Sequence, residues 1–222
     1  LDFLRLGAGA RAAAMAEAES KGIACRGDAV VDAGVSDGEL ESMNDAGVRG
    51  LRFNLVDVAD PAKGPPLESL AGLCRRVARL GWHGEFLIHV DDYPNLDEMF
   101  AAFPVPIVIG HMGYSRLEQD AASAGFQAML RLAGAGKCWI KLTAPYRIAA
   151  GDLPYEKATG FAQAVIEAAP ERTLWGTDWP HVMVTKAMPN DADLADLLAQ
   201  WCPDGGARKR ILVDNPAMLY GF

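Results

Sequence analysis

The sequence lacks the patterns on which metal clusters, disulfide frameworks and nucleic-acid surfaces depend. Its 222 residues include only four cysteines, and no two of them form a CxxC pair. Such wide spacing argues against a zinc cluster and against disulfides, and it predicts reduced thiols, most of them buried. Lysine and arginine form no run longer than the triplet 208–210, and the formal net charge is −8. Because phosphate contacts supply most nucleic-acid affinity, an acidic chain without a basic patch is not expected to bind nucleic acid.

Long apolar segments and nucleotide-binding motifs are also missing. No apolar run approaches the roughly 18 residues that a membrane-spanning helix needs. The N-terminal segment lacks a basic stretch followed by an uninterrupted apolar one, which argues against a signal peptide. We therefore expect a cytoplasmic protein without membrane contact. No P-loop is present, and no GxGxxG motif follows the first expected strand, which argues against a nucleotide site.

Apolar segments of strand length alternate along the chain with segments of helical periodicity. Strands are expected at residues 22–32, 51–56, 85–90, 107–109, 138–142 and 173–175. Helices are expected at residues 36–47, 67–80, 126–132, 155–168, 194–201 and 208–213, with a further short helix from 95. This alternation with short connections predicts parallel βαβ units, and it leaves an open doubly wound sheet and a (β/α)₈ barrel as alternatives.

Reactive side chains stand where the expected strands end and loops begin. They are Arg52, His89, His111, Lys141 and Asp178. In a (β/α)₈ barrel the C-terminal ends of the strands form the face that carries the active site. Five such ends in succession are more informative than any one of them, and they indicate an enzyme.

Asp178 is the strongest candidate for chemistry. It follows the last expected strand and is flanked by Gly176 and by Trp179, so we expect a rigid, partly apolar environment. A carboxylate there can take a proton from water or bind a metal, and the alternative is an Asp that only caps a turn.

His111 follows the fourth expected strand. Its imidazole can polarise a substrate carbonyl or bind a metal, and the alternative is a histidine hydrogen-bonded within the protein.

The other histidines are weaker candidates. His89 is followed by two aspartates that can orient it or cap the loop. His181 comes three residues after Asp178, where we expect it to support the site, with a ligand role as the alternative. His83 precedes its expected strand, so it is expected to be a surface or capping histidine.

Two arginines are candidates for binding an anion. Arg52 and Arg147 are expected to point toward the same edge, and guanidinium groups bind carboxylates bidentately. The alternative for each is a salt bridge to one of the many acidic residues. Tyr146 beside Arg147 is either a hydrogen-bonding residue of the site wall or a packing residue.

Five segments of the chain carry a family resemblance. They are GVRGLRFNLV, GHMG, KLTAPYR, WGTDWPH and ILVDNPAMLYGF. Together they resemble the amidohydrolase-related (amidohydrolase 2) family, and within it the 2-pyrone-4,6-dicarboxylate lactonase group, over roughly residues 23–222. The resemblance implies a distorted (β/α)₈ barrel that hydrolyses a carboxylated lactone without a bound divalent metal.

The resemblance also implies roles for individual residues. Asp178 would be the general base, and His111 would polarise the carbonyl. Arg52 and Arg147 would bind substrate carboxylates. We add His89 and Tyr146 to the residues expected to contact the substrate.

Two departures from the family pattern affect these expectations. The family opens with an HxH motif on the first barrel strand, and these 222 residues contain none. We therefore expect a single barrel domain over 1–222 that lacks its N-terminal strand or strands, with 1–22 poorly assigned. The lactonases usually carry a further basic residue shortly after RFN, whereas Asp57 and Asp60 stand here. This second departure makes another substrate, such as a sugar-acid lactone, an alternative.

The sequence thus predicts a hydrolase that opens a small anionic lactone with water activated by Asp178. One alternative is a zinc-dependent decarboxylase of the same superfamily, with zinc held by His111, Asp178 and His89. The other is an inactive truncated barrel. The expected partner is the small substrate alone, and the oligomeric state is not predicted.

Overall fold

The structure, a computed structural model, describes residues 17–56, 64–184 and 187–222. Six strands alternate with helices along the chain: β1 (Gly27–Ala29), β2 (Val48–Asn54), β3 (His83–Leu87), β4 (Ile107–Ile109), β5 (Cys138–Leu142) and β6 (Thr173–Trp175). They are hydrogen-bonded neighbours in chain order, and the pairs β1–β2 and β5–β6 are parallel. Chain order with helical crossovers is the arrangement of a (β/α)₈ barrel, so the expected α/β barrel-type architecture is confirmed.

The described residues form two compact units, and each is described by itself. The first runs to residue 86 and includes 103–107 and 222, and the second comprises 87–102 and 108–221. The prediction of a single domain stays a prediction. No helix within the described ranges is long and apolar enough to cross a membrane.

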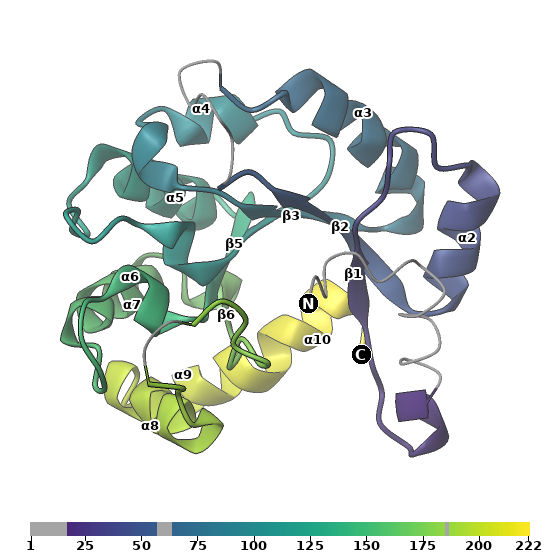
Figure 1. The fold of residues 1–222 in the computed structure, drawn as a ribbon. Helices are drawn as coiled ribbons and strands as arrows, with labels where there is room; N and C mark the ends of the chain where they lie inside the picture. Colours follow the sequence, from purple (N-terminus) through teal and green to yellow (C-terminus); the bar gives the residue numbers. More distant parts are fainter. Residues whose placement is uncertain (1–16, 57–63, 185–186) are drawn as a thin grey trace. The chain divides into compact units, whose positions relative to one another are not determined.

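The first unit contains β1, β2 and most of β3, with α2 (Asp37–Asp45) and α3 (Leu67–Val77) beside these strands (Figure 1). Its core includes Leu51, Cys74 and Trp82, which the alternating apolar pattern places on the inner faces of these elements. The helix α2 begins at a capping box. The Ser36 hydroxyl accepts a hydrogen bond from the backbone N–H of Glu39, whose carboxylate accepts one from the Ser36 backbone N–H.

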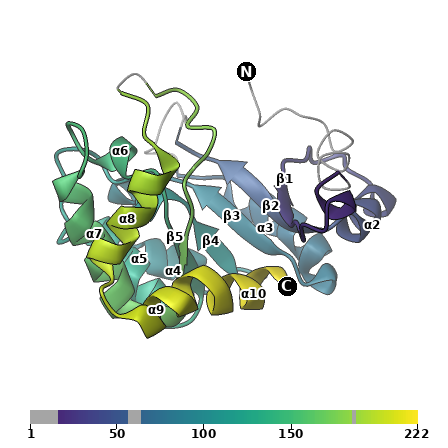
Figure 2. The same ribbon diagram turned by 90° about the horizontal axis from the view of Figure 1, so that it is seen from below.

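The second unit contains the end of β4, then β5 and β6, and most of the helices. These are α4 (Leu96–Phe100), α5 (Ala124–Gly134), α6 (Pro145–Ile148), α7 (Glu156–Ala168), α8 (Asp191–Trp201), α9 (Gly205–Lys209) and α10 (Asn215–Tyr220). Helices α5 and α7 pack together through Phe126 and Phe161, whose rings lie 4.9 Å apart. Leu219 and Tyr220 of α10 pack against Trp139 and Leu174. The ribbon of α9 and α10 is shown in Figure 2. These helices hold the ends of β5 and β6 in place.

The structure departs from several of the expected elements. β3 begins at His83 rather than at 85, because buried polar residues at its start hide the strand pattern; His83 is 1 % exposed, so the expectation of a surface histidine is wrong. The C-terminal helices form a longer run, with a π-helical turn (Arg210–Asp214) between α9 and α10. The short helix α6 was not expected.

Candidate active site

Three strand ends of the second unit bring the candidate residues together. β4 leads into Gly110 and His111, β5 into the segment 143–147, and β6 into Gly176 and Asp178. The register pairs Leu142 of β5 with Trp175 of β6, so the two following segments start side by side. Because parallel strands end at one edge, side chains that are far apart in sequence meet there.

The two oxygens of the Asp178 carboxylate have different surroundings. The Tyr146 hydroxyl donates to Oδ2 at 2.6 Å, and Arg147 donates to the same oxygen from Nε at 3.2 Å. Oδ1 lies 3.7 Å from Nε2 of His111, which is too long for a direct hydrogen bond. One oxygen is therefore held by the protein, while the other faces the imidazole across a short gap.

His111 is held from its opposite side. Its backbone N–H donates to the Thr143 hydroxyl at 3.2 Å, and its Nδ1 lies 2.7 Å from the same oxygen. The side chain of His111 is 8 % exposed and that of Asp178 is 21 % exposed, so water reaches both only in part. These contacts fix the ring with Nε2 toward Asp178.

A second set of contacts continues behind Tyr146. The Tyr146 oxygen lies 3.2 Å from Nδ1 of His181, and Nε2 of His181 lies 2.9 Å from Oδ1 of Asp191. His181 and Tyr146 are buried, whereas the Asp191 side chain is 46 % exposed. The contacts run without a break from Asp178 to the first turn of α8.

Arg147 and Tyr146 have shifted pKa values for identifiable reasons. Burial and the neighbouring Asp178 carboxylate raise the pKa of Tyr146 well above its usual range. Burial alone would lower the pKa of Arg147, but the charge of Asp178 and the contact with Tyr114 outweigh it and raise the pKa. Tyr146 thus stays a neutral hydrogen-bond donor, and Arg147 stays a cation.

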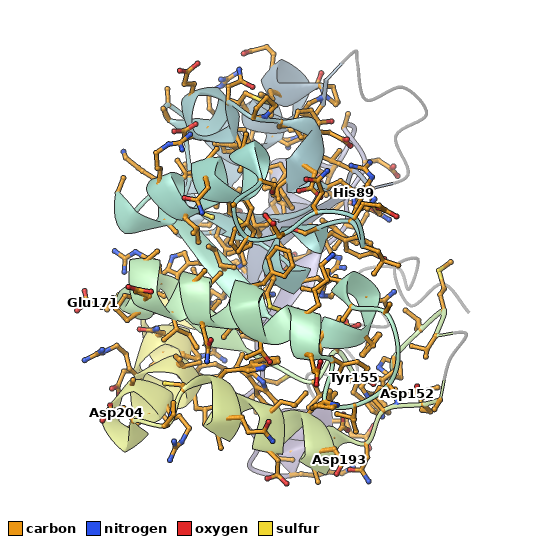
Figure 3. The ribbon with its side chains drawn as sticks, turned by 90° about the vertical axis from the view of Figure 1, so that its left-hand side faces the viewer. His89, Asp152, Tyr155, Glu171, Asp193 and Asp204 are labelled. Carbon is orange, nitrogen blue, oxygen red and sulfur yellow. The ribbon has the colours of Figure 1, made fainter. Side chains whose placement is uncertain are left out.

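His89, whose side chain is labelled in Figure 3, contacts Tyr114. Its Nδ1 contacts the Tyr114 carbonyl at 2.7 Å, and the two rings meet edge to face at 4.9 Å. Tyr114 in turn lies 5.7 Å from the His111 ring, centre to centre. The aspartates that follow His89 do not orient it, because both bind Arg116.

Seven residues of these loops have left-handed backbone conformations that side chains other than glycine rarely adopt. They have φ between 48° and 68° and are His111, Met112, Tyr114, Ala144, Asp178, His181 and Met183. Each such residue costs about 1–3 kcal/mol and persists only where the surroundings enforce it. Such strain gathers at functional sites, and here it falls on the candidate residues.

Arg52 lies in the first unit, where its Nη1 contacts Oε1 of Glu85 at 2.7 Å. Beside this pair, Nε2 of His83 lies 2.9 Å from Oδ1 of Asp28. Among the residues that the structure describes, Asp28, His83 and Glu85 form the group that could hold a metal ion, with ligand atoms all within 4.8 Å of one another. Gly50 sits against them, since a Cβ there would lie 2.4 Å from Asp28 Oδ1.

The zinc alternative can be tested on the donor set around Asp178. Within 17–56, 64–184 and 187–222, no third donor joins His111 and Asp178 at the spacing a metal ion needs. Arg147 also places a positive charge on the Asp178 carboxylate. The described residues around Asp178 therefore supply two of the three protein donors that a catalytic zinc site uses.

The structure brings Asp178, His111, Tyr146 and Arg147 together, with His181 behind them. Sequence reasoning missed Thr143, Tyr114 and Asp191. Thr143 and Tyr114 follow strand ends and could have been found by that signal. Asp191 gave no signal, because ten residues separate it from His181. Asp57 and Asp60 lie outside the described residues.

Comparisons with known proteins agree with this architecture. The sequence profile of the amidohydrolase family matches residues 2–222. A 2-pyrone-4,6-dicarboxylate hydrolase of Comamonas testosteroni is 36% identical over 226 residues, which cover 96% of this chain and 72% of that protein. A 4-sulfomuconolactone hydrolase of Rhizobium radiobacter is 37% identical over 187 residues, which cover 82% of this chain and 62% of its own length.

A solved structure from Pseudomonas putida, described as a 2-pyrone-4,6-dicarboxylic acid hydrolase, has the same fold. It superposes with a TM-score of 0.83 at 27% identity and covers 100% of this chain and 80% of its own. The resemblance seen in the five sequence segments is therefore confirmed. With a matching profile over nearly the whole chain and relatives above 30% identity, the chain belongs to the amidohydrolase family.

Proposed function

We propose that the protein hydrolyses a small carboxylated lactone, with Asp178 as the general base. The observation that carries the proposal is that the two oxygens of the Asp178 carboxylate have different contacts. Tyr146 and Arg147 hold Oδ2, while Oδ1 faces Nε2 of His111 at 3.7 Å. A water hydrogen-bonded to Oδ1 would have its base in contact, and the carbonyl oxygen of a lactone beside it could accept a hydrogen bond from His111 Nε2. The relatives named as lactone hydrolases support this reaction class.

In the proposed reaction, Asp178 Oδ1 takes a proton from water while the water oxygen bonds to the lactone carbonyl carbon. The carbonyl π electrons move to its oxygen, giving a tetrahedral oxyanion. When the oxyanion re-forms the carbonyl, the ring C–O bond breaks and the leaving oxygen takes the proton from Asp178. The new carboxylic acid then ionises, so each turnover releases one proton.

His111 is proposed to stabilise the oxyanion. The Thr143 hydroxyl accepts from the His111 backbone N–H, and its own proton can be donated to Nδ1 at 2.7 Å. That arrangement leaves the ring proton on Nε2, on the side of Asp178. A donor fixed in advance where negative charge develops is the most effective contribution that one residue makes to acyl transfer.

Arg147 is proposed to bind both the Asp178 carboxylate and a carboxylate of the substrate. Its Nε and Nη2 contact Asp178 Oδ2, and Nη2 also donates to the Val182 carbonyl at 2.8 Å. The Nη1 edge makes only a long contact of 3.5 Å with the Tyr114 hydroxyl, and a substrate carboxylate would bind there. Arg52 and His89 remain predicted substrate contacts.

The test is the exchange of Asp178 for Asn, which keeps the shape and removes the base. We expect hydrolysis of 2-pyrone-4,6-dicarboxylate, or of the best substrate in a panel of carboxylated and sugar-acid lactones, to fall by about 10²–10⁴-fold in kcat. The matched control is Asp196→Asn, which removes the same charge from an exposed position on α8 and leaves kcat unchanged. Hydrolysis by Asp178→Asn within tenfold of the parent would show that Asp178 is not the base.

A further inference from the structure

The guanidinium of Arg147 has two sides, and the protein binds only one of them closely. Nε and Nη2 lie against the Asp178 carboxylate, and Nη2 also donates to the Val182 carbonyl at 2.8 Å. Among the described residues, Nη1 makes one contact, at 3.5 Å to the Tyr114 hydroxyl, whereas a good N–H···O hydrogen bond is about 2.7–3.2 Å long. The side chain is 14 % exposed, so bulk water covers little of the Nη1 side. This side therefore has hydrogen-bonding capacity that a ligand can use.

The Tyr114 hydroxyl also has a proton that it can donate to a ligand. A phenol hydroxyl has one proton and accepts through its lone pairs, and Arg147 Nη1 donates to the Tyr114 oxygen. In the described part of the chain this is the hydrogen bond that the hydroxyl makes, so its proton has no acceptor there. Nη1 and the hydroxyl are thus two donors 3.5 Å apart, on the segments that follow β4 and β5.

We propose that the Tyr114 hydroxyl and Arg147 Nη1 together bind a carboxylate of the substrate, and that Tyr114 sets the preference for anionic lactones. The inference rests on the proposed function, to which it adds a second donor and a specificity-determining residue. Both donors can bind one carboxylate oxygen, or each can bind one of the two oxygens. Because Nε and Nη2 face Asp178, the bound carboxylate lies across the cation from the proposed base.

Several contacts fix Tyr114 before any ligand binds. His89 Nδ1 donates to the Tyr114 carbonyl at 2.7 Å, and the His89 ring packs edge to face against the Tyr114 ring. Two residues later, the guanidinium of Arg116 contacts both oxygens of Asp92, at 2.7 Å and 2.9 Å. Tyr114 itself has a left-handed φ of 48°, a conformation that persists only where the surroundings enforce it. Because the hydroxyl is held in place, little side-chain entropy is lost when a ligand binds.

The charge of Arg147 is the reason to expect an anion rather than a neutral group. Hydrogen bonds to an ionised acceptor are about twice as strong as those between neutral groups. A lactone with a carboxylate on its ring gains both contacts in full, whereas an ester or a hydroxyl at the same place gains less. Tyr114 therefore contributes more to the binding of a carboxylated lactone than to the binding of an uncharged lactone of the same shape.

The first experiment measures the binding of isophthalate, a planar benzene dicarboxylate that contains no ester to hydrolyse. Tyr114→Phe keeps the ring that packs against His89 and removes only the hydroxyl. We expect isothermal titration calorimetry to show a Kd at least about tenfold higher than that of the parent, because a hydrogen bond to a charged group is lost. Tyr93→Phe is the matched control, since it removes a hydroxyl from the loop after β3, where the neighbouring charges are Asp92 and Arg116. Its Kd should stay within about twofold of the parent.

The second experiment measures steady-state hydrolysis of the best carboxylated lactone in the substrate panel. Tyr114→Phe should raise KM about tenfold and leave kcat within about threefold, because the hydroxyl binds the carboxylate equally in the ground state and the transition state. The variant should melt within about 2 °C of the parent, since the hydroxyl makes only one long contact within the described residues. A fall in kcat at unchanged KM would show that Tyr114 acts on the reacting groups or on the fold, and would overturn the subsite.

The two experiments separate the subsite from the proposed function. Isophthalate binding that depends on Tyr114, in a protein that hydrolyses none of the lactones, would support the subsite and reject the proposed function. Hydrolysis with a KM that Tyr114→Phe leaves unchanged would keep the proposed function and reject the subsite. Failure of the parent to bind isophthalate, or equal losses of affinity in Tyr114→Phe and Tyr93→Phe, would also overturn the subsite.

Discussion

Replacing Gly50 with alanine should destabilise the first unit, because no space exists there for a methyl group. Its Cβ would lie 2.4 Å from Asp28 Oδ1 and 2.5 Å from His83 Nε2, so both atoms would have to retreat by about 1 Å to reach ordinary contact. Asp28 is the register partner of Gly50 across β1 and β2, and the His83 side chain is 1 % exposed, so neither can move easily. Overpacking of this kind costs about 1–3 kcal/mol, and disrupting a buried pair costs about 3–5 kcal/mol. Because Asp28 is partly exposed, we expect a loss of about 3 kcal/mol.

The assay is thermal and urea unfolding followed by circular dichroism. For a chain of this length, about 3 kcal/mol lowers Tm by about 6–12 °C. Gly72→Ala is the matched control, since a Cβ at this helical position meets only Arg75 Nη2 at 3.8 Å. It should raise stability slightly, because alanine is the better helix former. A Gly50→Ala protein that melts within 2 °C of the parent would show that Asp28 and His83 can move away from the new methyl group at little cost in stability.

Three further predictions follow from the second unit and from the thiols. Arg147→Lys should lower kcat about 10–100-fold, measured by steady-state hydrolysis, because an ammonium group cannot span the Asp178 carboxylate and a second acceptor as a planar fork does. The free energy of unfolding should fall above about pH 10, where the unfolded chain ionises Tyr146 and the folded protein, with its raised pKa, does not; urea titrations of Tyr146→Phe should show a smaller fall. Half-buried Cys25 should react with iodoacetamide at pH 8 at least about a hundredfold faster than Cys74, whose pKa burial raises to about 12, and peptide mass spectrometry would report both rates.

The strands could be predicted from the sequence where apolar residues run unbroken. β4, β5 and β6 begin and end at the expected residues, because each is a short buried segment bounded by glycine, proline or polar residues. β3 was placed too late because His83 and Glu85 are buried in spite of their polarity. Strand prediction takes buried positions to be apolar, and a buried ion pair breaks that rule. The buried polar residues can be recognised only when their partners on the neighbouring strands are known.

The candidate site could be predicted as a set of strand ends but not as a network. Parallel strands guarantee that His111 and Asp178 share an edge, so sequence order was enough to group them. Hydrogen-bond partners depend on rotamers and on the path of each loop. The assignment of Oδ2 to Tyr146, and the link from His181 to Asp191, could therefore come only from coordinates. All four cysteines are free thiols, as the spacing indicated.

The left-handed residues around Asp178 have a consequence for directed evolution. Glycine at position 111 or 178 would relieve about 1 kcal/mol or more of backbone strain while deleting the side chain that the reaction needs. A library selected for thermostability alone would therefore drift toward inactive sequences at these positions. Selection for heat resistance has to be coupled to turnover in the same screen, or the most stable survivors will be those that have lost the reaction.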